Sequence, residues 1–494
     1  MTSGKPAAEA PTKPQAAGGS PPLSLWTKVA YGIGAVAYGV KDGGFAYFML
    51  LFYSQVVGLD AQYVGQAIMI ALIFDAFGDP LVGYLSDNLH SRWGRRHPFM
   101  YAAAVPVSVS YYFLWSPPVG WSHDALFYYL LGLSIFIRFF ITLFETPSAA
   151  LTPELTQDYD ERSSLISYRT YFGWTGGNAM SVMMFMLVFP AFVTATIPNG
   201  QFNREAYSTY GLVAAILIFS TIIISSLGTH SRIPYLKAPP PKRQITLGIA
   251  LKEILAPLAN RSFAALFVAT IFGSIGAGLS AALAFYLLTY FWGFTSLQIG
   301  IVTLGVFLSA IIGAVLAPIV TRSMGKKRGA IVTGVIAFVG SPLPVALRLW
   351  GVLPDGPTPF VFWFVFWSGV VDVGLIICFQ ILGASMMADL VEQWELKTGR
   401  RSEGTFVAVN TFVRKLVNGL GVLTATYLLT LAKFPAGATP AQVPAEALRL
   451  LGTYYVPTIL GLWMSMMLAI SAYTLTRGQH EENLRKLDER KRST

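Results

Sequence analysis

Long apolar runs separated by short polar stretches make up the chain from about residue 29 to residue 476. A helix needs roughly 20 mainly apolar residues to cross the hydrocarbon core of a bilayer. Twelve runs meet this requirement and are predicted to be membrane-spanning helices. They cover about 29–57, 63–87, 98–117, 123–150, 165–193, 207–229, 261–292, 296–321, 329–350, 359–388, 403–432 and 449–476.

The polar segments divide the chain into parts. The first residues are rich in Ala, Pro, Gly, Lys and Ser and lack the apolar core of a signal peptide. A Pro- and Lys-rich stretch separates the sixth run from the seventh. The predicted parts are a disordered cytoplasmic tail at 1–24, an N-terminal six-helix bundle at 25–229, a cytoplasmic linker at 230–260, a C-terminal six-helix bundle at 261–476 and a charged cytoplasmic tail at 477–494.

Basic residues are distributed unevenly over the two ends of the predicted helices. Lys and Arg favour the cytoplasmic loops of membrane proteins. With both termini in the cytoplasm, the cytoplasmic segments hold 26 of the 35 Lys and Arg, the opposite side holds four, and five lie within the runs. The pattern therefore predicts a multi-pass protein of the plasma (inner) membrane with cytoplasmic termini.

The two halves of the chain carry related segments about 235 residues apart. The loop after the second run reads Ser91-Arg92-Trp93-Gly94-Arg95-Arg96, and the loop after the eighth reads Ser323-Met324-Gly325-Lys326-Lys327-Arg328. The fourth run ends in Pro153-Glu154-Leu155 and the tenth in Ala388-Asp389-Leu390. This duplication favours an all-α membrane protein with the major facilitator fold, in which two pseudo-symmetric six-helix bundles enclose a substrate site.

Composition agrees with a membrane protein and excludes several function classes. Hydrophobic residues make up 54% of the chain and charged residues 12%, against roughly 25% charged in soluble proteins. The net charge of +10 does not indicate nucleic-acid binding, because the basic residues are spread between apolar runs. The sequence contains no metal-ligand cluster, no catalytic set and no P-loop of an ATP-driven pump. The expected partners are the bilayer and a small-molecule substrate, without a cofactor, for a monomer that is not an enzyme.

Several charged residues lie well inside the apolar runs, where a charge costs about 2.5–3.5 kcal/mol on insertion scales and marks a functional site. They are Lys41, Asp42, Asp75, Asp79, Arg138, Glu145, Arg169, Asp372, Arg414 and Lys415. Charges at these depths are typical of proteins that move ions or polar solutes across the membrane.

Two carboxylates on the second run are placed to hold a cation. Asp75 and Asp79 are four residues apart and share one face of a helix. Because they repel when both are ionised, a proton or a bound cation is expected between them. Thr142 and Glu145 are three apart on the fourth run, and the Thr142 hydroxyl can add a neutral oxygen to a Na⁺ site. Alternatively, Asp79 only caps or orients the turn before Pro80.

Basic residues of the runs have several interpretations. Three of them can neutralise the acids or hydrogen-bond a substrate: Lys41, Arg169 and Lys415. Arg169 can instead be a structural partner of Asp42. Arg138 and Arg414 are expected to snorkel toward the membrane interface. Asp372 has no evident partner in the sequence.

Charged residues near the predicted cytoplasmic face have a gating interpretation. Arg92, Arg95 and Arg96, with Asp87, would stabilise one conformation by pairing with acids of the other repeat; alternatively, they only signal topology. The end of the tenth run is expected to form gate salt bridges through Asp389, Glu392 and Arg401.

Several short motifs follow the same order as in a known family of membrane proteins. They are Lys41-Asp42, Asp75-Ala76-Phe77-Gly78-Asp79-Pro80, Ser91-Arg92-Trp93-Gly94-Arg95, Glu145-x-Pro147, Met387-Ala388-Asp389 and Arg414-Lys415. In these motifs the chain resembles the glycoside–pentoside–hexuronide:cation symporters over nearly its whole length after the tail. The resemblance implies alternating access by two rocking helical bundles.

The resemblance also implies roles for the matching positions. The implied cation site, for Na⁺ or H⁺, consists of Asp75, Asp79, Thr142 and Asp42. The implied substrate cavity is lined by Lys41, Asp42, Glu145, Ala149, Arg169, Gln380, Asn410, Thr411 and Lys415.

Four positions depart from the pattern of that family, and one of them is Glu145, which replaces an Asp. Gly78 replaces an Asn that lies beside the cation in a member of the family, which removes an oxygen ligand, weakens the case for Na⁺ and strengthens that for H⁺ without deciding between them. Ala149 and Gln380 replace two Trp residues whose rings stack on a sugar, which argues against a simple galactoside. The animal sodium-dependent lysophosphatidylcholine symporters are similar in the same motifs.

The expected function is therefore Na⁺- or H⁺-coupled symport of a sugar or glycoside. The alternative substrate is an amphiphile such as a lysophospholipid. A polytopic membrane enzyme is a remoter alternative, because the acids lie deep within the runs and not in a catalytic set near an interface. Composition does not exclude a channel or receptor, but the duplicated halves favour alternating access.

Overall fold

A computed structural model describes residues 22–236, 260–398, 403–475 and parts of 478–489, and these segments form helices joined by loops, without strands. Most residues of the predicted tails and of the predicted linker lie outside the described residues.

The first helix begins after Ser24, whose side chain accepts a hydrogen bond from the backbone N–H of Thr27 and so caps the first turn. The first predicted run is interrupted by π-helical turns. The elements are α1 (Leu25–Ile33), α2 (Ala35–Gly43), η1 (Gly44–Phe48), α3 (Met49–Leu51), η2 (Phe52–Val56), α4 (Ala61–Asn88), α5 (His97–Leu114), α6 (His123–Leu155), α7 (Tyr159–Met183), η3 (Met184–Val188), α8 (Phe189–Ala191), η4 (Gly200–Phe202), α9 (Arg204–His230) and η5 (Ile233–Tyr235).

Helices of the second half repeat this layout, with a break in the ninth run where Pro342 separates two helices. The elements are α11 (Arg261–Tyr286), η7 (Leu287–Phe291), α12 (Ser296–Met324), α13 (Lys326–Gly340), α14 (Leu343–Leu349), α15 (Pro359–Thr398), α16 (Glu403–Leu431), η8 (Pro440–Gln442) and α17 (Ala445–Ser471). Every predicted run is therefore helical, although α15 continues ten residues beyond its predicted end. The helix α7 begins six residues early, because the Asp158 carboxylate caps it at the backbone N–H of Glu161.

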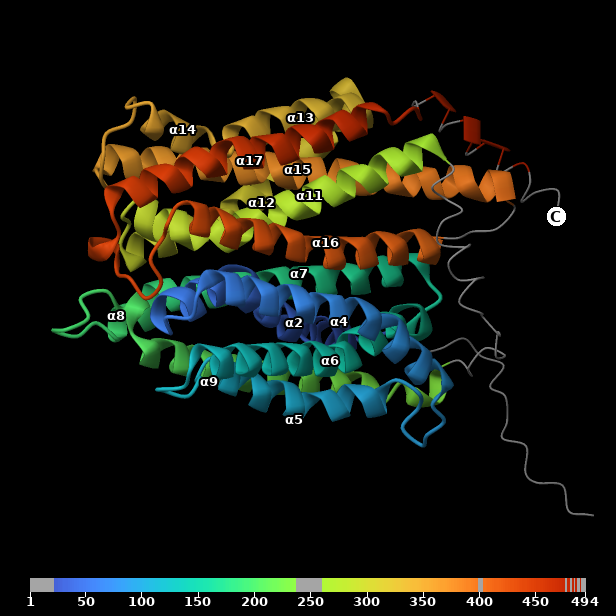
Figure 1. The fold of residues 1–494 in the computed structure, drawn as a ribbon. Helices are drawn as coiled ribbons and strands as arrows, with labels where there is room; N and C mark the ends of the chain where they lie inside the picture. Colours follow the sequence, from blue (N-terminus) through green and yellow to red (C-terminus); the bar gives the residue numbers. More distant parts are fainter. Residues whose placement is uncertain are drawn as a thin grey trace, which may run out of the picture.

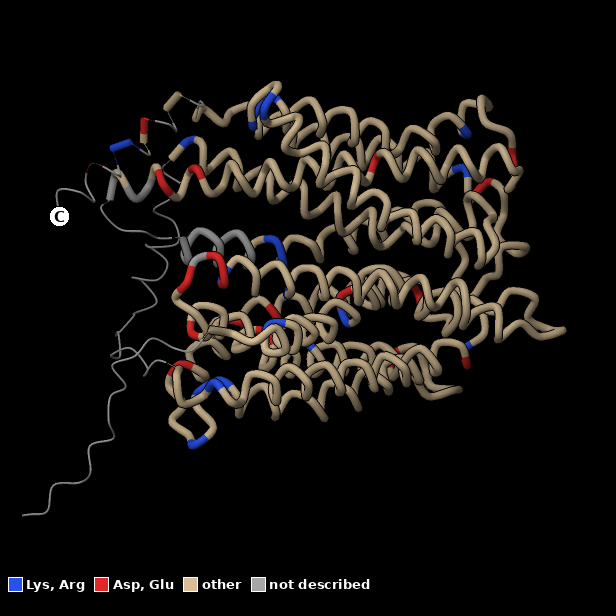
Figure 2. The backbone as a smooth tube through the Cα atoms, turned by 180° about the vertical axis from the view of Figure 1, so that it is seen from behind, with Lys and Arg blue, Asp and Glu red and all other residues tan. Residues whose placement is uncertain are grey.

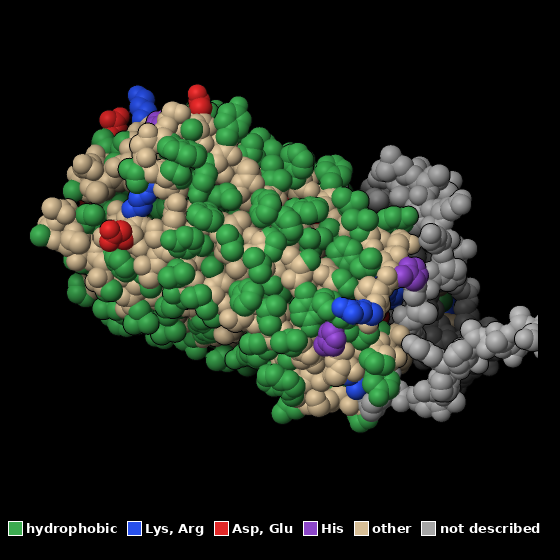
Figure 3. All heavy atoms as spheres, turned by 90° about the horizontal axis from the view of Figure 1, so that it is seen from below, with side chains coloured by type: hydrophobic (Ala, Val, Ile, Leu, Met, Phe, Trp, Pro, Cys, Tyr) green, Lys and Arg blue, Asp and Glu red, His purple; other side chains and the backbone are tan. Residues whose placement is uncertain are grey.

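Within the described residues, nine helices are long and apolar enough to cross a membrane. Figure 3 shows the face that includes α5, α6 and α9, where hydrophobic side chains cover a broad band and charged side chains lie near its two ends. Val105, Val109 and Phe113 of α5 are among the exposed apolar residues. Apolar side chains exposed at this density require a lipid environment.

The helices of each half pack mainly on one another. In the first half α4 packs on α6, α5 on α9 and α2 on α7, and in the second half α12 packs on α15 and α11 on α16. Figure 1 shows the first-half helices in the lower part of the molecule and the second-half helices in the upper part. The two groups meet where α4 contacts α16 and α7 contacts α12.

Hydrogen bonds join the two halves at the end of the molecule that carries α8 and α14. The buried Gln55 side chain donates to the Tyr286 hydroxyl at 3.2 Å. Gln201 donates to Thr289 at 3.0 Å, and Ser296 donates to Asn199 at 3.0 Å. This end of the molecule, which is opposite the starts of α1 and α11, is therefore held closed.

Candidate functional site

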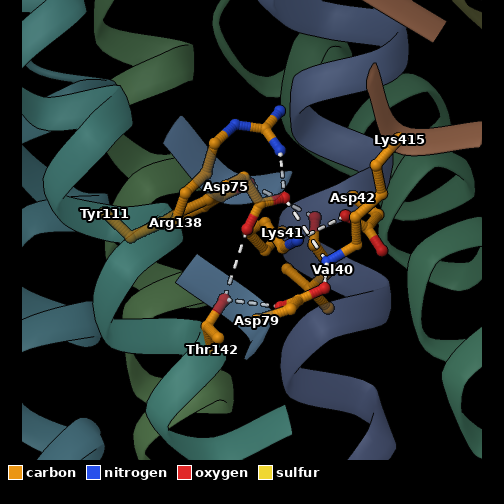
Figure 4. Close-up of polar contacts among 9 residues, drawn as sticks. All are labelled: Val40, Lys41, Asp42, Asp75, Asp79, Tyr111, Arg138, Thr142 and Lys415. Atoms are coloured by element: carbon orange, nitrogen blue, oxygen red, sulfur yellow. Dashed lines mark hydrogen bonds and ion pairs between the residues drawn. The ribbon is translucent and has the colours of Figure 1, made fainter. Parts of the chain in front are cut away.

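Asp75 lies in the middle of a group of polar side chains between helices α4, α6 and α16 (Figure 4). Its carboxylate is 4% exposed. The Arg138 Nη1 atom lies 3.2 Å from Asp75 Oδ2, and the Thr142 hydroxyl donates to Oδ1 at 3.2 Å. Both partners come from α6, where a spacing of four residues places them on one face. A carboxylate this deeply buried needs such partners, because an unpaired buried charge costs several kcal/mol.

Asp79 lies one turn further along α4 and contacts the second half of the chain. Lys415 Nζ of α16 lies 2.6 Å from Asp79 Oδ2 and 3.5 Å from Asp75 Oδ2. The Thr142 hydroxyl is 3.3 Å from Asp79 Oδ1. The side chain of Asp79 therefore points to these partners, and the alternative of a cap on the turn before Pro80 does not describe its contacts.

These five side chains, Asp75, Asp79, Arg138, Thr142 and Lys415, form what we call the carboxylate cluster. Its two carboxylates face two cations, so it is formally neutral. The Thr142 hydroxyl has one hydrogen and can donate to only one of the two carboxylates at a time. The other carboxylate oxygen then has room for a proton or for a bound cation. In this structure the charges of the two carboxylates are balanced by Arg138 and Lys415.

Lys41 and Asp42 lie beside the carboxylate cluster at the end of α2. Lys41 is buried, and its ammonium is 2.5 Å from Asp42 Oδ1, while the Asp42 side chain is 59% exposed. The helix continues here into the π-helical turn η1, and the Tyr111 hydroxyl donates to the Val40 carbonyl at 3.3 Å. Irregular turns of this kind re-aim side chains and are frequent at functional sites.

Arg169 of α7 contacts the same part of the first run. Its Nε donates to the Tyr38 hydroxyl at 2.8 Å, and its Nη2 donates to the Glu145 carbonyl at 3.5 Å. The pair with Asp42 that the sequence left open does not form, because Asp42 pairs with Lys41. The helices α2 and α7 approach closely at Gly39, where a side-chain carbon would collide with the Gly173 carbonyl.

Small residues also bring Lys415 to the cluster. A side-chain carbon at Gly419, one turn after Lys415 on α16, would collide with Met69 of α4. On the other side of α16, a side-chain carbon at Gly421 would collide with the Ile275 carbonyl of α11. Close packing on both sides therefore fixes α16 between α4 and α11.

Arg138 corrects one prediction. It was expected to snorkel to the interface, yet it is 6% exposed and paired with Asp75. It lies 15 residues after the start of α6, about 22 Å along the helix, which is too deep for snorkelling. Its spacing of four residues from Thr142 was the signal that could have placed it in the site. Tyr38 was also missed, although it is four residues before Asp42 and therefore on the same helix face.

The remaining predicted site residues are not part of the carboxylate cluster. Glu145 and Ala149 are half-buried on α6, Gln380 is exposed on α15, and Arg414 is exposed on α16. The side chains of Asn410 and Thr411 lie outside the described residues. Asp372 lies on α15 against Gly340, away from the carboxylate cluster.

The predicted gating residues form ion pairs, but within their own half of the chain. Arg96 contacts Glu154 at 3.0 Å and Asp87 at 2.5 Å, and Arg95 contacts Glu154 at 2.7 Å. In this conformation Arg95 and Arg96 pair with Glu154, which lies at the end of α6 beside the start of α5. Their pairing with acids of the other repeat stays a prediction for another conformation. The guanidinium of Arg92 lies 5.5 Å from the centre of the Trp93 ring.

The second half repeats this ion pair. Lys326 Nζ lies 2.7 Å from Asp389 Oδ1, between the start of α13 and α15. Lys326 follows Gly325 as Arg95 follows Gly94, and Asp389 precedes Leu390 as Glu154 precedes Leu155. Glu392 lies half-buried on the next turn of α15, and Arg401 lies outside the described residues. Figure 2 shows most charged residues near the ends of the helices.

No group of three or more His, Cys, Asp or Glu within the described residues is arranged to hold a metal ion. Asp75, Asp79 and Thr142 present oxygen atoms to one another in the carboxylate cluster. Such hard oxygen ligands suit Na⁺, and a carboxylate can equally take up H⁺.

Comparison with known proteins gives consistent matches. The family described as MFS/sugar transport protein matches residues 30–477. An uncharacterised symporter from Synechocystis is 26% identical, covering 95% of this chain and 98% of its own. A glucuronide carrier protein homologue from Escherichia coli is 24% identical, covering 95% and 97%. The crystal structure of a D-xylose–proton symporter has a TM-score of 0.60 at 16% identity and covers 89% of this chain and 97% of its own.

Proposed function

This chain belongs to the MFS/sugar transport protein family, in its glycoside–pentoside–hexuronide:cation symporter branch. From that premise we propose that it is a secondary active transporter that couples symport of a sugar or glycoside to Na⁺ or H⁺. The observation that carries the proposal is the carboxylate cluster, which joins a candidate cation site on α4 and α6 to Lys415 of the second half. The matched relatives are transporters and not enzymes.

The proposed architecture has twelve membrane-spanning helices in two bundles of six. Nine helices satisfy the length and apolarity of a span, and the three other helical runs, at 25–56, 97–114 and 403–431, complete the alternation. Both termini are then cytoplasmic, which agrees with the placement of the basic residues. The protein acts as a monomer without a cofactor, in the inner membrane.

Hydrogen bonds and an ion pair between the two halves support alternating access. Hydrogen bonds such as Gln55–Tyr286 support a state that is closed on the side opposite the termini. In that state Lys415 neutralises Asp79 from the second half. A coupling cation bound at Asp75 and Asp79 would give the cluster a net positive charge, so the Lys415 ammonium would be displaced. Cation binding is thereby linked to the contact between the halves.

The proposed substrate site lies beside the cluster, around Lys41, Asp42, Arg169 and Glu145. These groups donate and accept hydrogen bonds in the manner that sugar hydroxyls require. Ala149 and Gln380 stand at positions where a member of the family has Trp. The ring of Tyr38, whose centre lies 5.3 Å from the Arg169 guanidinium, supplies an aromatic group in this region. The name of the E. coli relative supports a glycoside, and no relative described above supports the lysophospholipid alternative.

Transport by the purified protein tests this function. The protein is reconstituted in liposomes, and uptake of a labelled hexoside, pentoside, glucuronide and lysophosphatidylcholine is measured with an inward Na⁺ gradient, an inward H⁺ gradient or neither. We expect one of the three sugars to accumulate above its external concentration with one cation gradient and to equilibrate without it. Accumulation that is independent of both gradients, or uptake of the lysolipid alone, would contradict the proposal.

The charge of Lys415 is predicted to be needed for coupled transport. Lys415→Gln removes the ammonium that neutralises Asp79, leaving two acids to repel each other at the junction of the halves. We expect the initial rate of gradient-driven uptake to fall about tenfold, the typical weight of one charge-assisted hydrogen bond. Arg414→Gln is the matched control, because it removes the same charge from the adjacent, exposed residue. Equal losses in the two variants would exclude a specific role for Lys415.

A further inference from the structure

A hollow lies on the outer surface of the second half, away from the carboxylate cluster. It has a volume of about 590 Å³ and is bounded by α13, α14 and the first half of α15. Figure 1 shows these helices along the upper edge of the molecule, on the side remote from the first half. Aromatic side chains form much of its wall: Phe360, Trp363, Phe364 and Trp367. We call this hollow the α15 pocket.

Asp372 is the one charged residue in the wall of the α15 pocket. Its Oδ1 atom is fully buried and has no hydrogen-bond partner. Ser341 lies beside the carboxyl group. Among the described residues no Lys, Arg or His forms an ion pair with Asp372. The carboxyl group therefore keeps an unused acceptor just behind the aromatic wall of the pocket.

The break between α13 and α14 adds further acceptors beside Asp372. Pro342 and Pro344 have no N–H, so they cannot donate to the carbonyls of Phe338 and Gly340, four residues earlier. The Asp372 Oδ1 atom would lie 3.5 Å from a side-chain carbon built on Gly340, which places the carboxyl group directly at this break. Of these two residues, Gly340 lies in the wall of the pocket, so its carbonyl lacks the usual intrahelical donor beside Asp372.

The depth of Asp372 limits what can reach it. It lies 13 residues after Pro359, the start of α15, or about 20 Å along the helix. The hydrocarbon core of a bilayer is about 30 Å thick, so Asp372 lies near its middle. Several wall residues, including Phe360, Trp363 and Trp367, are at least half exposed. The pocket therefore opens to the acyl chains of the membrane, far from phospholipid headgroups.

We propose that the α15 pocket binds a lipophilic amine that enters from the bilayer in its ammonium form. A carboxylate neutralises the ammonium, the spare acceptors match its N–H groups, and the faces of Trp363 and Trp367 stabilise a desolvated cation. The apolar remainder of the ligand fills the aromatic part of the hollow. This site is independent of the sugar and coupling-ion sites of the proposed transport function.

Fluorescence quenching tests the proposal, because two pocket residues are tryptophans. The protein in phosphatidylcholine nanodiscs is titrated with 11-bromoundecylamine or with the neutral 11-bromoundecan-1-ol, whose bromine quenches nearby tryptophan. Both probes partition into the bilayer, so the alcohol reports non-specific contact. The pair Trp363→Phe and Trp367→Phe, combined in one variant, identifies the share of the signal that arises in the pocket.

We expect the amine to quench the pocket tryptophans at about tenfold lower concentration in the membrane than the alcohol does, and Asp372→Asn to remove that difference. Asp355→Asn, in an exposed loop of the same half, is the matched control and keeps the difference. Equal quenching of the unaltered protein by both probes would overturn the proposal and indicate an acyl-chain groove only. The comparison of amine with alcohol on the unaltered protein tests the proposal even if Asp372→Asn does not fold. Retained preference for the amine in a folded Asp372→Asn protein would also overturn it.

Discussion

Asp75→Asn is expected to reduce gradient-driven accumulation of the substrate to the level of empty liposomes, while exchange of labelled for unlabelled substrate continues. The carboxylate is buried between Arg138, Thr142 and Lys415, so it is the charge that a coupling cation would meet in the cluster. The amide keeps the size of the side chain but can neither bind a proton nor neutralise Na⁺. Accumulation needs the coupled cation, whereas exchange needs only the movement of the loaded carrier.

The measurement compares uptake against a gradient with counterflow in the same liposome preparation. Asp124→Asn is the matched control, because Asp124 is an exposed carboxylate in the first turn of α6, the helix that carries Arg138 and Thr142. We expect this control to accumulate substrate normally. Full accumulation by Asp75→Asn would show that the cluster is not the coupling site. Loss of both activities would assign Asp75 a structural role.

Arg138→Met is expected to destabilise the folded protein by about 3–5 kcal/mol, the usual cost of removing one partner from a buried ion pair. The variant leaves Asp75 with Lys415 at 3.5 Å as its remaining ion-pair partner. It also removes the guanidinium that lies 4.6 Å from the centre of the Phe45 ring. Methionine is apolar and flexible and can fill the space of the arginine stem.

Unfolding of the single and double variants measures this effect. The double variant Arg138→Met with Asp75→Asn removes both charges of the pair, so we expect it to recover most of the lost stability. Arg414→Met is the control, because Arg414 is exposed and its loss costs little. A double variant as unstable as the single one would show that Arg138 stabilises the fold through other contacts. A single variant as stable as the control would show that the pair contributes little.

Much of the fold was predictable from local pattern. Hydrophobic length located every helical run and placed most helix ends within about five residues, and the spacing of Asp75 from Asp79 predicted a shared face. The largest differences, at the start of α7 and the end of α15, arise where polar turns extend a helix beyond the apolar run. A cap such as Asp158 is visible in the sequence, but its use depends on where the preceding helix ends.

The partners of the charged residues were less predictable. The sequence left open whether the arginines of the loop after α4 pair with the other repeat or only signal topology, and it gave no sign that Glu154 of the same half contacts both Arg95 and Arg96. Arg138 was assigned to the interface because its distance from the run's edge was judged by sequence alone. A single chain position does not reveal which side chain lies opposite on a neighbouring helix.

The sequence by itself determined that this chain is a helical membrane transporter with acids on the second and fourth runs, because hydropathy, charge bias and helical spacing are local properties. Only the tertiary structure decided that Arg138 and Lys415 meet Asp75 and Asp79, which are 63 and 336 residues away along the chain. Those meetings depend on glycine-mediated packing of α16 against α4 and α11, and the hydrophobic pattern carries no information about which faces approach.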